Sequence, residues 1–125
     1  MNQNLPINQV IPDIRSALNE DNQLILSAPP GAGKTTQVPI ALLDEEWLGE
    51  RIIIMLEPRR LAARNAAARM AFLLNESVGE TVGYQIKMDS VFSKKTKILV
   101  VTEGILTRKL QADPALENVA LIIFD

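Results

Sequence analysis

Short apolar runs recur along the chain and are separated by stretches with a different spacing of apolar residues. These runs predict buried strands at Gln23–Ser27, Ile52–Leu56, Lys97–Thr102 and Leu121–Phe124. Runs of this length that are rich in β-branched residues are typical of parallel strands covered on both faces. A shorter strand is predicted at Thr81–Lys87.

Helical spacing is found between these runs. Near the start, apolar residues repeat every four positions at Val10, Ile14 and Leu18. The clearest stretch is predicted to place six residues on one buried helical face: Leu61, Ala62, Ala66, Met70, Leu73 and Leu74. Shorter helices are predicted from Lys34 to Asp44, where Pro39 should disturb the first turns, and around Ile105–Gln111. Strands that alternate with helices predict an α/β domain, with a parallel sheet flanked by helices.

The strongest chemical signal follows the first predicted strand. Residues 28–36 read Ala-Pro-Pro-Gly-Ala-Gly-Lys-Thr-Thr, which matches the Walker A pattern of a phosphate-binding loop. In such a loop the backbone N–H groups and the positive end of the next helix face the phosphates. Lys34 would reach the β- and γ-phosphates, and the Thr35 hydroxyl would bind Mg²⁺. An ordinary strand–turn–helix junction is the alternative, but Gly-x-Gly-Lys-Thr after a strand disfavours it.

The loop departs from the strict pattern at one point, because Ala28 stands where its first glycine would be. Pro29 and Pro30 have no N–H to donate to phosphate. Hydrogen bonds to charged groups contribute roughly 1.5–3 kcal/mol each, so a handful would support nucleotide binding. The predicted donors are the backbone N–H groups of Gly31, Ala32, Gly33, Lys34, Thr35 and Thr36.

The last predicted strand ends in an aspartate. Four apolar residues followed by Asp125 form the Walker B pattern, which places a carboxylate at the carboxyl edge of the sheet beside the phosphate loop. There Asp125 would hold Mg²⁺ through water. The alternative is a turn or helix-capping aspartate. No turn or cap follows this strand, so we expect the chain to be the front part of a longer protein, incomplete at its C-terminus.

Two more strand-to-helix junctions carry polar residues. Pro58 ends the second strand, and Arg59 and Arg60 begin a helix, at whose positive end arginine is unfavourable unless an anion binds there. On residue physics alone, this pair fits a bound phosphate backbone and a solvated helix face equally well.

The second of these junctions follows the Lys97–Thr102 strand. Thr102 and Gly104 could expose backbone N–H groups one turn before Arg108, but the residues alone favour a plain N-cap by Thr102 followed by Glu103. Tyr84 could stack on a nucleic-acid base, although a packed strand tyrosine with a satisfied hydroxyl is the commoner case.

Composition narrows the chemistry. The chain has 125 residues, the size of one domain, with no cysteine and no histidine. Disulfides, thiolate metal sites and histidine-based acid–base chemistry within this chain are therefore excluded. Residues 1–20 show no secretory signal and no apolar run is long enough to span a bilayer, so we expect a cytoplasmic protein without a membrane partner.

The net charge leaves a local contact with nucleic acid open. The formal net charge is −2, from 13 basic and 15 acidic residues, which argues against binding over the whole surface. The basic residues are unevenly placed, however, because five lie in Arg51–Arg69 and four in Lys87–Lys97.

These motifs together resemble the first RecA-like domain of a DEAH-box nucleic-acid helicase, over nearly the whole chain. The string Gly-Ala-Gly-Lys-Thr-Thr-Gln-Val-Pro at 31–39 resembles motif I, Pro58-Arg59-Arg60 resembles motif Ia and Thr102-Glu103-Gly104 resembles motif Ib. Residues 56–64 and 101–108 are most similar to the bacterial HrpB-type branch.

The resemblance implies the ATP-binding portion of an ATP-dependent helicase or translocase that acts on single-stranded nucleic acid, with RNA favoured over DNA. It implies that the catalytic residues include Lys34 and Asp125, with ATP and Mg²⁺ as cofactors. The sugar–phosphate backbone would be held without sequence readout by Pro58, Arg59, Arg60, Thr102, Glu103, Gly104 and Arg108.

The resemblance also implies parts that this sequence does not contain. Asp125 would open an Asp-Glu-x-His motif, whose glutamate positions the attacking water, and a second RecA-like domain would follow. We therefore expect this fragment alone to be inactive. In related sheets a later strand lies between the phosphate-loop strand and the Walker B strand, so we also expect a gap in this sheet and low stability.

Two other functions fit part of the pattern. A phosphate-loop kinase or small-molecule ATPase would share the loop and the metal-binding aspartate but would not need the arginine pair. A nucleotide-gated binding module without catalysis would keep the phosphate loop and the arginine pair but would lack the downstream glutamate.

Overall fold

The computed structural model of the chain describes residues 24–27 and 39–124. One six-stranded sheet forms its centre, with the strand order β1-β6-β2-β5-β3-β4. The strands are β1 (Leu24–Ser27), β2 (Ile52–Leu56), β3 (Val82–Ile86), β4 (Asp89–Val91), β5 (Ile98–Val101) and β6 (Val119–Phe124), and the two longer helices are α3 (Arg60–Leu73) and α4 (Glu103–Ala112). Five strands run parallel, and β4 pairs antiparallel with β3.

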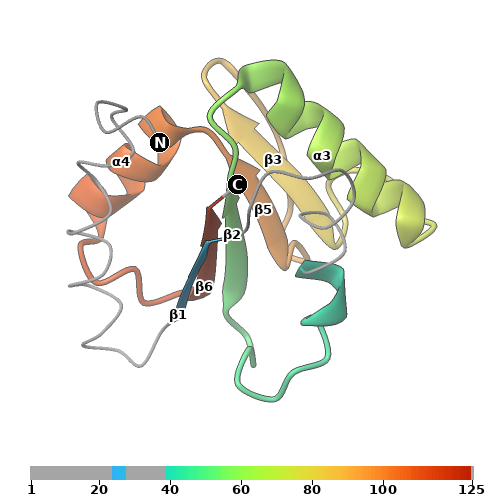
Figure 1. Ribbon diagram of the computed structural model, residues 1–125, viewed down its shortest axis with the longest axis horizontal. Helices are drawn as coiled ribbons and strands as arrows, with labels where there is room; N and C mark the ends of the chain where they lie inside the picture. Colours follow the sequence, from blue (N-terminus) through green and yellow to red (C-terminus); the bar gives the residue numbers. More distant parts are fainter. Residues whose placement is uncertain (1–23, 28–38, 125) are drawn as a thin grey trace.

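The two helices cover opposite faces of the sheet (Figure 1). Successive residues of a strand point to opposite faces, so β2 contributes Ile53 and Met55 to the core under α3 but Ile54 and Leu56 to the core under α4. This double burial is the reason that the strands read as continuous apolar runs. The predicted α/β architecture, a mostly parallel sheet flanked by helices, is therefore confirmed.

The expected gap between the phosphate-loop strand and the last strand was wrong. β1 pairs directly with β6, in a parallel register that runs from Leu24 opposite Leu121 to Ser27 opposite Phe124. Unpaired backbone N–H and C=O groups on a buried strand are costly, and direct pairing of these two strands satisfies them. β6 is thus held between β1 and β2.

The predicted buried face of α3 was partly wrong. Leu61 is 69% exposed and Leu73 is 43% exposed, whereas the buried residues of the helix are Ala63, Ala67, Met70 and Ala71. Small side chains allow the helix backbone to approach the sheet closely, so the alanine stripe rather than the leucine stripe forms the contact. Periodicity alone could not separate two neighbouring stripes on one alanine-rich helix.

Strand β4 was missed by the sequence analysis. Its hairpin with β3 pairs Tyr84 with Val91 and Ile86 with Asp89, which leaves Lys87 and Met88 as the turn. Met88 adopts a positive φ of 65°, a conformation usually taken by glycine or asparagine in such turns. The sequence therefore carries no recognisable turn signal at this point.

The other predicted strands and the helix predicted around Ile105–Gln111 agree with the structure to within about two residues at each end. The helix predicted to run to Asp44 ends earlier, because residues 39–41, which include Pro39, are helical and residues 42–44 form a turn. The predicted start of that helix at Lys34 and the periodic stretch from Val10 to Leu18 lie outside the described residues. Of the helices described here, none is long and apolar enough to cross a membrane.

Candidate nucleic-acid interface

Four parallel strands end side by side at one edge of the sheet, the edge formed by their carboxyl ends. Leu56, at the end of β2, is the register partner both of Val101, at the end of β5, and of Phe124, at the end of β6. Phe124 in turn lies opposite Ser27, the last residue of β1. The segments that follow these strands therefore start along one line, which is where parallel α/β sheets bind their ligands.

The segment after β2 forms a tight turn into α3. The Glu57 backbone N–H donates to the carbonyl of Val101 at 2.9 Å, which extends the β2–β5 pairing by one residue. Arg59 is the N-cap of α3, with φ −101° and ψ 131°, and its carbonyl accepts the N–H of Ala63. The Arg59 side chain is 82% exposed. The turn thus directs an exposed guanidinium outward at the start of a helix.

The start of α3 suits an anion. Its first turn contains no acidic residue, and both Arg59 and Arg60 are exposed there. The positive end of the helix and the two guanidinium groups therefore place positive charge at the same point. They repel one another there unless an anion is bound. A surface hollow of about 490 Å³ adjoins them, lined by Arg59, Arg60, Leu61, Ala62 and Asn65. The structure brings together the arginine pair that the sequence singled out.

The start of α4 lies at the same edge but covers the other face. Thr102 is its N-cap residue, as predicted, but the Thr102 side chain makes no capping hydrogen bond, so the expected side-chain cap was wrong. Glu103 lies in the first turn, where its charge suits the helix dipole. Gly104 is exposed, and a Cβ added there would meet no atom within 4 Å. Arg108 is exposed one turn further on.

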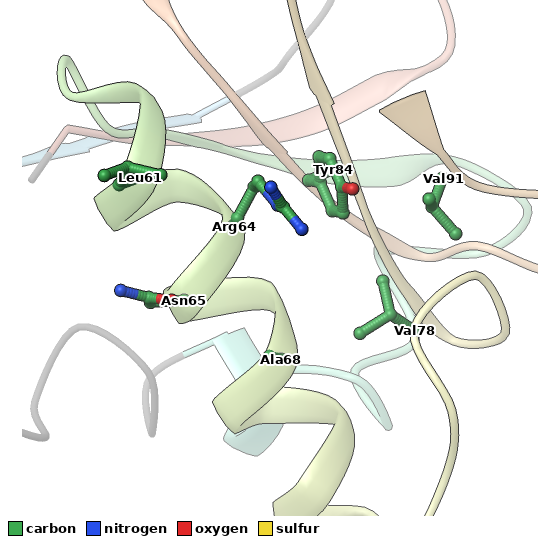
Figure 2. A pocket seen from close by; sticks show the side chains of 7 residues that line it. All are labelled: Leu61, Arg64, Asn65, Ala68, Val78, Tyr84 and Val91. Atoms are coloured by element: carbon green, nitrogen blue, oxygen red, sulfur yellow. The ribbon is translucent and has the colours of Figure 1, made fainter. Parts of the chain in front are cut away.

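Tyr84 is part of the core rather than a platform for stacking. It is 6% exposed, and its hydroxyl lies 3.1 Å from each carboxylate oxygen of Asp89. In α3, Arg64 Nε lies 3.6 Å from Asp89 Oδ2, and Arg64 Cζ lies 5.8 Å from the centre of the Tyr84 ring. Figure 2 shows Arg64 extending from α3 toward Tyr84. Both residues line a hollow of about 440 Å³. The packing interpretation of Tyr84 is confirmed, and these contacts attach α3 to the β3–β4 hairpin.

We expect the Tyr84 hydroxyl to titrate above its usual pKa of 10.0, first because of burial and second because Asp89 accepts its hydrogen bond. A raised pKa in the folded state means that the native protein binds this proton more tightly than the unfolded chain. The free energy of unfolding should therefore fall as the pH rises above the unfolded value of about 10.

The measurement is direct because Tyr84 is the only tyrosine among the 125 residues. Tyrosinate absorbance of this chain as a function of pH should give a midpoint above 10.0, and Asp89→Asn should lower that midpoint without returning it to the usual value. A wild-type midpoint at or below 10.0 would contradict the burial of the hydroxyl.

Several predicted site residues lie outside the described residues. These are the phosphate-loop residues Gly31, Ala32, Gly33, Lys34, Thr35 and Thr36, and the metal-binding residue Asp125. The structure does describe the strands that lead to them, because Ser27 ends β1 and Phe124 ends β6.

Sequence analysis missed Glu57, which is buried at the same edge with 5% exposure. A charged residue directly after a buried apolar run, before a proline, was the signal that could have identified it.

The fold and this edge define a class: α/β proteins with ligand-binding segments at the carboxyl ends of parallel strands. The arginine pair at the start of α3 follows β2, the strand that pairs with β6. The chain belongs to the DEAD/DEAH box helicase family, whose model matches residues 8–125.

Individual relatives agree with the family. The chain is 50% identical over 121 residues to the ATP-dependent RNA helicase HrpB of Escherichia coli, covering 97% of this chain and 15% of that protein. It is 38% identical over 125 residues to the DExH-box ATP-dependent RNA helicase DExH1 of Arabidopsis thaliana, covering 97% of this chain and 13% of that protein. The resemblance seen in the motifs is thus confirmed, and the chain spans about one-seventh of the length of the E. coli relative.

Solved structures give the same result. A crystal structure of the E. coli DExH-box NTPase HrpB superposes with a TM-score of 0.73 at 49% sequence identity, covering 100% of this chain and 15% of that one. At this identity the likeness extends to the family and not to the fold alone.

Proposed function

We propose that this chain is the ATP-binding portion of a DEAH-box ATP-dependent RNA helicase, which couples ATP hydrolysis to translocation or strand separation. One observation carries the proposal: β1, β6, β2 and β5 end in register at a single edge. The nucleotide motifs follow β1 and β6, and the arginine and Thr-Glu-Gly motifs follow β2 and β5. Family membership supports the same function.

On this proposal the nucleotide is held by the segments after β1 and β6. The backbone N–H groups of residues 31–36 and the Lys34 ammonium bind the phosphates, and Thr35 and Asp125 supply oxygen ligands of the kind that Mg²⁺ prefers. The direct pairing of β1 with β6 supports this donor set, because both segments begin at neighbouring strand ends. Bound Mg²⁺ would neutralise phosphate charge.

The nucleic-acid backbone is held by the segments after β2 and β5. Backbone contacts of this kind position a strand but carry no sequence information, which suits a helicase that must move along any sequence. The proposed contacts are Pro58, Arg59, Arg60, Thr102, Glu103, Gly104 and Arg108. A second RecA-like domain later in the full-length protein is the proposed partner that closes over this edge when ATP binds.

Family membership bears differently on the two alternative functions, the phosphate-loop kinase and the binding module without catalysis. Family membership argues against a phosphate-loop kinase. A nucleotide-gated module without catalysis would share the fold, the loop and the arginine pair, so ATP turnover by the full-length protein is the measurement that separates it from a helicase.

Replacing the arginine pair should weaken RNA binding in a salt-dependent way. Each ionic contact with a phosphate of a single strand contributes about −0.7 to the slope of log affinity against log salt, and Arg59→Ala/Arg60→Ala removes two such contacts. The slope should therefore become less negative by about 1.4, as measured by fluorescence anisotropy with single-stranded RNA and full-length protein.

Arg69→Ala is the matched control, since Arg69 is an exposed arginine further along the same helix. It should keep the wild-type slope. If the double variant also keeps it, α3 does not contact the nucleic acid.

A further inference from the structure

One charged side chain is buried at the proposed RNA-binding edge. Among the described residues, Glu57 is the one buried residue with a carboxylate or a cationic group, and its side chain is 6% exposed. Removing a carboxylate from water is unfavourable unless hydrogen bonds and an opposite charge compensate. A buried carboxylate that directly follows a strand therefore needs a structural explanation.

Two of the contacts of Glu57 are made with Arg59. Oε1 accepts the backbone N–H of Arg59 at 3.2 Å, and Arg59 Nε lies 3.6 Å from the same oxygen. The first contact holds the backbone of the N-cap residue, and the second holds the base of its guanidinium group. One oxygen atom thus restrains both the main chain and the side chain of Arg59.

The restraint leaves Arg59 accessible. Nε is the guanidinium nitrogen nearest the backbone, so a contact there leaves the end-on edge formed by the two terminal amino groups for another acceptor. The side chain is 82% exposed although its base is held by a buried carboxylate. A guanidinium group restrained in this way loses less conformational freedom when it binds phosphate.

We propose that Glu57 is a positioning residue for RNA binding: its carboxylate holds the Pro58–Arg59 turn so that Arg59 and Arg60 face the phosphate backbone at the start of α3. The inference rests on the proposed function. Glu57 does not touch RNA itself, and its negative charge would oppose phosphate binding. Its contribution comes from the acceptor oxygen rather than from the charge.

Two substitutions of similar size separate acceptor from charge. Glu57→Gln keeps an acceptor oxygen and removes the charge, whereas Glu57→Met removes both without leaving a large cavity. We expect Glu57→Gln in the full-length protein to bind single-stranded RNA within about twofold of wild type and to keep the wild-type salt slope. Glu57→Met should weaken binding roughly fivefold and make the slope less negative by about 0.7, the value of one lost phosphate contact.

A control variant tests the specificity of this effect. Glu76 also anchors a loop, since its carboxylate accepts the N–H and the hydroxyl of Thr81 at 3.0 Å, but this loop precedes β3 at the opposite edge of the sheet. Glu76→Met should change stability without changing the salt slope. A purely structural role for Glu57 would likewise alter melting and leave the slope at its wild-type value.

The outcomes are separable. Wild-type affinity and slope in Glu57→Met, or a fivefold loss in Glu57→Gln, would overturn the inference, and the second result can be read even if the methionine variant does not fold. If Arg59→Ala/Arg60→Ala weakens binding while Glu57→Met does not, only the positioning role fails. If the arginine variant has no effect either, the proposed function of this edge fails first.

Discussion

Lys34→Ala is expected to abolish ATP turnover by the full-length protein. Lys34 is the one side chain of the loop that carries a positive charge, and on our proposal its ammonium group reaches the β- and γ-phosphates. Charge that develops on the phosphates during transfer would lose this stabilisation. Removal of a single such donor lowers kcat by roughly 10²–10³-fold in other enzymes. Phosphate release under saturating ATP would measure the loss.

The matched control is the substitution of another lysine, one that lies away from the proposed nucleotide site. Lys94 is exposed in the loop between β4 and β5, at the opposite edge from the strand ends, so Lys94→Ala should retain wild-type turnover. Binding of a fluorescent ATP analogue would show whether Lys34→Ala also weakens nucleotide affinity. Unchanged turnover in Lys34→Ala would refute the assignment of the phosphate loop.

Gly83→Ala is expected to destabilise the fold by about 1–3 kcal/mol, the usual cost of inserting atoms into a packed core. A Cβ at position 83 would lie 2.5 Å from the carbonyl oxygen of Val91 and 2.7 Å from Cβ of Phe92. The closest atom belongs to the backbone, so the β4 strand itself must shift. Urea unfolding followed by circular dichroism would measure the change in the free energy of unfolding.

Gly104 is the control position for Gly83→Ala, because an added Cβ there would meet nothing within 4 Å. Gly104→Ala replaces a glycine inside α4 and should be neutral or stabilise the helix by up to about 1 kcal/mol. Because Tyr84 follows Gly83, movement of β4 in Gly83→Ala should also lower the raised pKa of the Tyr84 hydroxyl. A Gly83→Ala variant as stable as Gly104→Ala would contradict the close packing of the hairpin.

The elements that sequence analysis predicted well are those with a repeated local signal. Ile52–Leu56 was predicted with the bounds that β2 has, because a short run rich in β-branched residues is typical of a parallel strand covered on both faces. The exposed Leu61 shows where such signals fail, since helical spacing does not say which of two neighbouring stripes meets the sheet. β4 was missed because a turn through Lys87 and Met88 contains no glycine, asparagine or proline.

The candidate site likewise contains residues that the sequence predicted and one residue, Glu57, that it did not. The residues alone left the roles of the arginine pair at 59–60 and of the Thr-Glu-Gly string at 102–104 open, and the family resemblance made both of them predicted nucleic-acid contacts. The phosphate loop was predicted from its spacing. Their chemistry is local, because a loop or a helix start needs only a few consecutive residues. Glu57 was overlooked, since its burial and its contacts with Arg59 depend on the packing around β2.

The sequence by itself determined the α/β class and the order of α3, α4 and every described strand except β4, because each follows from the pattern of neighbouring residues. Only the tertiary structure decided that β1 pairs with β6, that Leu56 lies beside Val101 and that the alanine face of α3 meets the sheet. These arrangements join segments far apart in the chain, and they are chosen by close packing and backbone pairing in the whole core.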